Sequence, residues 1–96
     1  MYKFRVASSY KNTFDEIIRD NDALRKRVMV ALEKLAENPK HPSLHSHKVN
    51  TLAYGQRWSS GATGDIRIIW DYDNENRLII LLLDIGSHSG THKVYK

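Results

Sequence analysis

The sequence contains no cysteine, and this absence excludes three kinds of protein at once. A chain without thiols is not a disulfide-stabilised scaffold, has no thiolate zinc site and uses no cysteine nucleophile. Long apolar runs are missing as well: the longest covers residues 78–83, whereas a membrane-spanning helix needs about 20 apolar residues. Residues 1–5 alternate polar and apolar side chains, unlike the apolar block of a signal peptide. We therefore expect a cytoplasmic protein.

Glycine and proline are scarce, at 5 and 2 of the 96 residues, and no internal repeat or low-complexity tract divides the chain. Apolar residues make up 41% and charged residues 27%, which is the balance of an ordinary globular protein. We expect a single domain over residues 1–96. Lysine and arginine number 15 against 11 aspartate and glutamate, and the net charge of +4 favours a polyanionic partner, either nucleic acid or an acidic protein.

The first half of the chain carries one strand pattern and two helical patterns. Polar and apolar residues alternate over residues 2–6, which is typical of a half-buried strand. Ser8 and Ser9 then offer side-chain oxygens to cap a helix with apolar residues at helical spacing. Residues 20–22 end this helix and cap a second one, which has a single apolar stripe and ends before Pro39. We interpret both apolar stripes as core and assign them no function.

The second half carries strand patterns joined by turns. A short strand is expected around residues 48–52, and another over residues 57–63. Residues 65–72 alternate so that one face is apolar and the other bears Arg67. Residues 73–76 have turn chemistry, and residues 78–85 are apolar on both faces except at Asp84, as in a central strand.

The order of the main elements, β-α-α-β-β-β, indicates the fold class. Helices and strands come in separate runs, which favours an α+β fold. We predict that two N-terminal helices pack on one face of a small, twisted, antiparallel sheet. Arg67 then points away from the helix-packed core, where a mid-strand arginine is usually solvated or ion-paired.

His88 follows the last apolar run and is the best candidate for proton transfer, because an unperturbed imidazole titrates at about pH 6.5. The alternative is an exposed histidine in a polar tail. His45 and His47, together with His88 and His92, could supply four imidazoles to zinc, but no recognised metal motif is complete. We predict neither a metal nor a cofactor.

Three motifs point to one known family. Residues 37–39 (Glu-Asn-Pro) end the second helix, residues 64–70 (Gly-Asp-Ile-Arg-Ile-Ile-Trp) form a strand, and residues 83–88 (Leu-Asp-Ile-Gly-Ser-His) form the last strand and its exit. In this order, over nearly the whole chain, they resemble the RelE/ParE superfamily of toxins from bacterial type II toxin–antitoxin systems. The resemblance implies a RelE-like fold and, in the mRNA interferase branch, metal-independent cleavage of mRNA on the ribosome.

In that branch a 2′-hydroxyl attacks the adjacent phosphate, which requires a base, an acid and cations. The resemblance gives Arg67 the position of the arginine on the scissile phosphate and His88 that of the catalytic histidine. It implies further site residues: His47, His92 and Tyr95 in catalysis, and Lys48, Arg57 and Lys93 in RNA binding. It also implies a cognate antitoxin, expected to be acidic and encoded by the adjacent gene, and the ribosome as partners.

The chain departs from the family pattern in two places. The aromatic residue usually found four positions after the histidine is replaced by His92, and Tyr95 comes later. Residues 60–62 (Ser-Gly-Ala) stand where an arginine is often found, so fewer side chains are expected to contact the phosphate. Two alternatives therefore stay open: a ParE-like toxin that inhibits DNA gyrase without cleaving RNA, and a degenerate member that acts only in its antitoxin complex.

Overall fold

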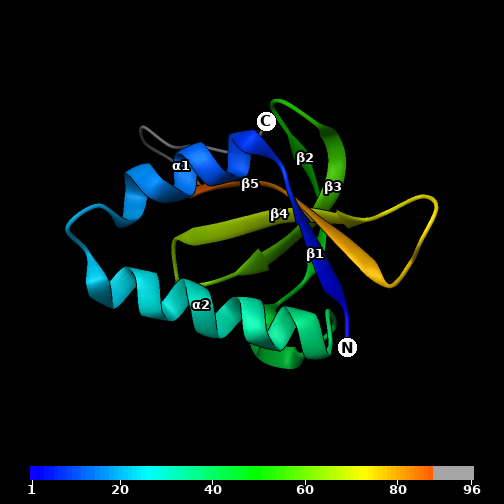
Figure 1. Ribbon diagram of the computed structural model, residues 1–96, viewed down its shortest axis with the longest axis horizontal. Coiled ribbons are helices and arrows are strands. Elements are labelled where there is room, and N and C mark those ends of the chain that lie inside the picture. Colours follow the sequence, from blue (N-terminus) through cyan, green and yellow to red (C-terminus); the bar gives the residue numbers. More distant parts are fainter. Residues whose placement is uncertain (88–96) are drawn as a thin grey trace.

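Two helices cover one face of a five-stranded sheet in the part of the chain that the computed structural model describes, residues 1–87 (Figure 1). The elements are β1 (Lys3–Val6), α1 (Ser8–Ile18), α2 (Asp22–Glu37), the 3₁₀ turn η1 (Pro42–Leu44), β2 (His47–Thr51), β3 (Gly55–Gly61), β4 (Ile66–Tyr72) and β5 (Ile79–Ser87). Neither of the two described helices is long and apolar enough to cross a membrane.

The two helices begin and end close to the predicted positions, but the first is not capped as predicted. The side chain of Asn21 caps α2 by accepting a hydrogen bond from the Leu24 backbone amide at 3.1 Å. Ala7 is the N-cap of α1 and provides no side-chain bond, so the predicted serine cap is wrong. Ser9 lies inside the helix, where its hydroxyl donates to the carbonyl of Leu83 at 2.7 Å and also hydrogen-bonds the Tyr54 hydroxyl. This serine therefore ties α1 to the sheet.

The strands are ordered β1-β5-β4-β3-β2, and the predicted α+β class is confirmed. Strands β2 to β5 pair in antiparallel fashion, as predicted, and the short strand expected around residues 48–52 is β2. β1 instead lies parallel to β5, so the five-stranded sheet is mixed rather than wholly antiparallel. Because β1 and β5 are far apart in sequence, no hairpin determines their relative direction.

The core lies between the helices and one face of the sheet. Val28, Ala31 and Leu35 of α2 are buried there against alternate residues of β4, including Ile68 and Trp70. The remaining buried members of the cluster are Tyr10, Leu44, Ile80, Leu82 and Ile85. The predicted apolar stripe of α2 and the apolar face of β4 are therefore both core.

A bulge in β5 sets which of its side chains reach the core. Ile69 pairs with Asp84 but the next residue, Trp70, pairs with Leu82, so Leu83 is an extra residue in the strand. Leu82 and Ile85 can consequently both contribute to the core although they are three positions apart. Asp84 lies between them and shares the opposite face of the sheet with Ile69.

Candidate functional site

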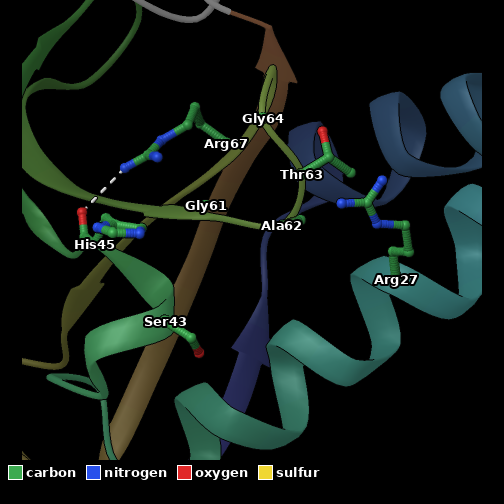
Figure 2. A pocket seen from close by; sticks show the side chains of 8 residues that line it. All are labelled: Arg27, Ser43, His45, Gly61, Ala62, Thr63, Gly64 and Arg67. Carbon is green, nitrogen blue, oxygen red and sulfur yellow. Dashed lines mark hydrogen bonds between the residues drawn. The ribbon is translucent and has the colours of Figure 1, made fainter.

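Arg67 lies on the sheet face away from the helices, as the strand pattern predicts, but it is buried rather than solvated, with 8% of its surface exposed. Its Nε donates to the Ser59 hydroxyl at 3.0 Å, and its Nη2 donates to the carbonyl of His45 at 3.1 Å (Figure 2). Nη2 is also 3.4 Å from the Ser59 carbonyl. The neighbouring strand β3 and the turn before β2 therefore hold the guanidinium in one orientation.

Gly61 makes room for this guanidinium. It pairs with Arg67 across β3 and β4, and a Cβ atom at Gly61 would lie 2.8 Å from Arg67 Nη1. Such a distance is shorter than any ordinary van der Waals contact, so a larger residue would displace the arginine. The glycine that weakens the predicted strand over residues 57–63 is thus what allows an arginine to lie flat against it.

Within residues 1–87, no carboxylate lies within ion-pairing distance of Arg67. The ion pairs of that region join Arg5 to Asp73, Lys11 to Asp15, Arg25 to Asp22 and Arg57 to Asp71. The acceptors that hold Arg67 are neutral, so its positive charge is shielded from water without being neutralised by them. A guanidinium in this state binds an incoming carboxylate or phosphate strongly.

A pocket of about 340 Å³ opens beside Arg67. Figure 2 shows its lining: Arg27, Ser43, His45, Gly61, Ala62, Thr63, Gly64 and Arg67. Among the residues that the structure describes, the lining includes two arginines, two hydroxyl groups and no carboxylate. The chemistry of this lining suits an anion such as a phosphate group together with part of the groups bonded to it.

His45 lines this pocket, and its carbonyl group connects Arg67 with His47. His45 has a left-handed backbone conformation (φ 48°), and its carbonyl accepts from both Arg67 and His47 Nδ1, the latter at 2.8 Å. His47 Nδ1 is also 3.5 Å from Arg67 Nη2. If Nδ1 carries the proton, Nε2 of the neutral ring is the nitrogen that can accept one. The structure thus places His47 beside Arg67, with one nitrogen suited to act as a base.

Lys48 and Arg57, the other described residues expected to bind RNA, do not join Arg67. Lys48 pairs with Trp58 and lies on the opposite face from His47, since neighbouring residues of a strand alternate. Its Nζ is 5.2 Å from the centre of the Trp58 ring, and Lys40 Nζ is 3.0 Å from the same centre. Burial and the charge of Lys48 lower the pKa of Lys40. Arg57 shares the face of Arg67 but is paired with Asp71 at 3.0 Å.

The predicted site residues His88, His92, Lys93 and Tyr95 lie outside the described residues. The pairing of β4 with β5 places Gly86 opposite Arg67 and Ser87 opposite Ile66, so the described part of the chain ends next to the pocket. Asp84 is the residue of β5 that precedes Gly86 on the same face of the sheet, and burial raises the pKa of its carboxyl. Within residues 1–87 no group of three or more histidine, aspartate or glutamate side chains is placed to hold a metal ion.

Sequence reasoning missed Ser59 and Arg27, and it considered His45 only as a possible zinc ligand. The two-residue spacing of Ser59 and Gly61 places them on one face of β3. The residues around them in the sequence do not indicate that Arg67 of the next strand would lie against them. His45 contributes its carbonyl group, which has no sequence signature. Arg27 belongs to the polar side of a helix interpreted only as core, although it stands in the basic run of residues 25–27.

Comparison with known proteins gives structural matches alone. No protein-family model matches the sequence, and no curated protein matches it. Among solved structures, a metal-bound toxin from Helicobacter pylori is similar, with a TM-score of 0.71, 16% identity, and coverage of 92% of this chain and 96% of that one. YafQ from E. coli has a TM-score of 0.64 at 10% identity, covering 91% of this chain and 93% of its own.

YafQ in its complex with DinJ is similar as well, with a TM-score of 0.63, 11% identity, and coverage of 92% and 94% of the two chains. At these identities the likeness establishes the fold. The RelE-like toxin fold predicted from the three motifs is therefore confirmed over nearly the whole chain.

Proposed function

We propose that this protein is the toxin of a type II toxin–antitoxin system and that it cleaves mRNA as an endoribonuclease. The buried guanidinium of Arg67, which has no carboxylate partner within residues 1–87 and lies at an anion-sized pocket, carries the proposal. The similarity of the fold to a Helicobacter pylori toxin and to YafQ supports the toxin assignment. The DinJ–YafQ complex supports an antitoxin as partner.

The proposed reaction is the attack of a ribose 2′-hydroxyl on the adjacent phosphorus. The bond from O2′ to phosphorus forms, the bond from phosphorus to O5′ breaks, and the products are a 2′,3′-cyclic phosphate and a 5′-hydroxyl. A base takes the proton from the 2′-hydroxyl and an acid returns one to O5′. His47 Nε2 is proposed as the base and His88 as the acid. Because the bonds to Ser59 and His45 orient it in advance, Arg67 can stabilise the charge that develops on the phosphorane.

The departure at residues 60–62 fits this proposal. Where other members often carry a second arginine, this chain has Gly61, which leaves space for the guanidinium of Arg67. In the proposed site one well-held arginine on the sheet replaces two.

The test is cleavage of an mRNA bound to purified ribosomes, with the new ends mapped by primer extension. The wild-type protein should produce discrete cuts with 5′-hydroxyl ends. Arg67→Gln should slow cleavage by about 10² to 10³, as expected for loss of a group that stabilises transition-state charge. Arg25→Ala, which removes an exposed arginine paired with Asp22, should cleave normally. Intact mRNA, together with gyrase trapped on broken DNA in cells that express the protein, would reject the nuclease in favour of the gyrase inhibitor.

A further inference from the structure

Three cations and two carboxylates of α2 line different hollows. Lys26, Arg27 and Lys34 contribute to hollows that continue from the Arg67 pocket. Glu33 and Glu37 line a different hollow, which lies between α2 and β1 and is otherwise apolar.

The hollows lined by these cations form one groove with the Arg67 pocket. Three adjoining hollows share Arg27 and Ala62, so they connect around the turn between β3 and β4. Figure 2 shows Arg27 reaching from α2 toward Thr63 in this turn. We call this the α2 groove; it runs from Arg67 past Arg27 to Lys26, Val30 and Lys34. No carboxylate belongs to its lining among the residues that the structure describes.

The cations of the α2 groove that stand on the helix have no acidic partner in the described part of the chain. None of Lys26, Arg27 and Lys34 takes part in an ion pair within residues 1–87, whereas their neighbour Arg25 is paired with Asp22. Lys26 and Lys34 are eight residues apart, which is about 12 Å along a helix. Val30 lies between them with 47% of its surface exposed, so the groove also offers an apolar contact.

We propose that the α2 groove binds the phosphate backbone of single-stranded RNA on one side of the scissile phosphate; this inference rests on the proposed function. A strand whose scissile phosphate is held by Arg67 must leave the pocket in both directions, and the α2 groove is a basic exit without carboxylates. Grooves that follow a single-stranded backbone are lined by cations in this manner. An acidic peptide is the other anionic polymer that could bind here, and the binding of polyglutamate distinguishes it in the experiment.

The experiment measures binding without cleavage. A fluorescently labelled 2′-O-methyl RNA oligonucleotide lacks the attacking hydroxyl, so its affinity can be followed by anisotropy over a series of salt concentrations. The slope of log K against log salt falls by about 0.7 for each lost phosphate contact on a single strand. Lys26→Ala, Arg27→Ala and Lys34→Ala together should therefore reduce the slope by about 2 and weaken binding at low salt.

Arg25→Ala is the matched control, since it removes one arginine from the same helix outside the groove and should leave the slope unchanged. Alanine favours helices, and thermal unfolding checks that the triple variant is folded. A triple variant that binds the oligonucleotide like the wild type, or an equal loss for Arg25→Ala, would overturn the proposal. So would a triple variant that loses only the binding of polyglutamate, because the groove would then take an acidic peptide.

The two proposals can fail separately. If the triple variant loses oligonucleotide binding as expected but the wild type cuts no ribosome-bound mRNA, the α2 groove stands and the nuclease function is rejected. If the wild type cuts mRNA and the triple variant binds the oligonucleotide normally, the function stands and the groove is rejected.

Discussion

Gly61 and Arg67 lie opposite each other on β3 and β4, and the guanidinium of Arg67 occupies the space that a side chain at Gly61 would need. The position of the buried cation thus depends on Gly61, which contributes empty space and has no side chain. This dependence can be tested without removing the arginine itself.

Gly61→Ala should displace the Arg67 guanidinium and slow RNA cleavage by about tenfold to 10³-fold, the upper limit being the cost of losing such a group entirely. The backbone at Gly61 is not left-handed, so alanine is acceptable to the strand and the midpoint of thermal unfolding should change little. Arg25→Ala is the control, because Arg25 is an exposed residue outside the pocket. Equal rates for the two variants would show that the orientation of Arg67 is unimportant.

His47→Ala should slow cleavage by about 10² to 10⁴ if its imidazole is the base, while the affinity for a 2′-O-methyl oligonucleotide persists. His45→Asn is the comparison, because asparagine tolerates the left-handed backbone and keeps the carbonyl that binds Arg67. We expect nearly normal cleavage from it. A normal rate for His47→Ala would remove this histidine from the mechanism.

His88 and Arg67 should differ in what their loss does. His88→Ala should abolish cleavage and leave RNA affinity intact, whereas Arg67→Ala should reduce both and make the binding less dependent on salt. His92→Ala and Tyr95→Ala then show which of the two replaces the usual aromatic residue of the family. If all four substitutions leave cleavage and toxicity unchanged, the site is elsewhere.

Asp84→Asn should stabilise the protein at neutral pH. Burial raises the folded-state pKa of Asp84 above its unfolded value, although the Ile85 backbone amide bonded to Oδ1 at 2.9 Å opposes the shift. The folded state therefore binds the proton more tightly, and this group's contribution to stability decreases as the pH rises through the two pKa values. Asparagine keeps an acceptor for the Ile85 amide and carries no charge.

Denaturant midpoints measured at pH 4 and pH 7 check this expectation. The gain of Asp84→Asn over the wild type should be larger at pH 7 than at pH 4. Asp65→Asn removes an equal charge from an exposed turn and controls for the change in net charge. A gain that is the same at both pH values would contradict the assigned cause.

Some features of the fold follow from local pattern and were predictable. The bounds of α2 depend on Asn21 at its start and on Asn38 followed by Pro39 at its end, all of which act within a few residues. β4 coincides closely with the predicted strand over residues 65–72, because strict alternation has one structural solution when one face is buried.

Other features escaped prediction because they depend on partners remote in the sequence. The bulge at Leu83 becomes visible only when β4 and β5 are paired, and the direction of β1 only when it meets β5. The resemblance implies site roles for both His47 and Lys48, yet neighbouring residues of a strand lie on opposite faces, and only His47 is beside Arg67.

The sequence by itself determined that Arg67 stands on the face of β4 away from the helices, since alternation is a property of the strand alone. Only the tertiary structure decided that this arginine is buried, because its burial requires Ser59 and Gly61 from the next strand and the carbonyl of His45 from the turn before β2. The α2 groove likewise depends on the tertiary structure. Its cations are visible in the sequence, but their connection to Arg67 exists only where α2 passes the turn between β3 and β4.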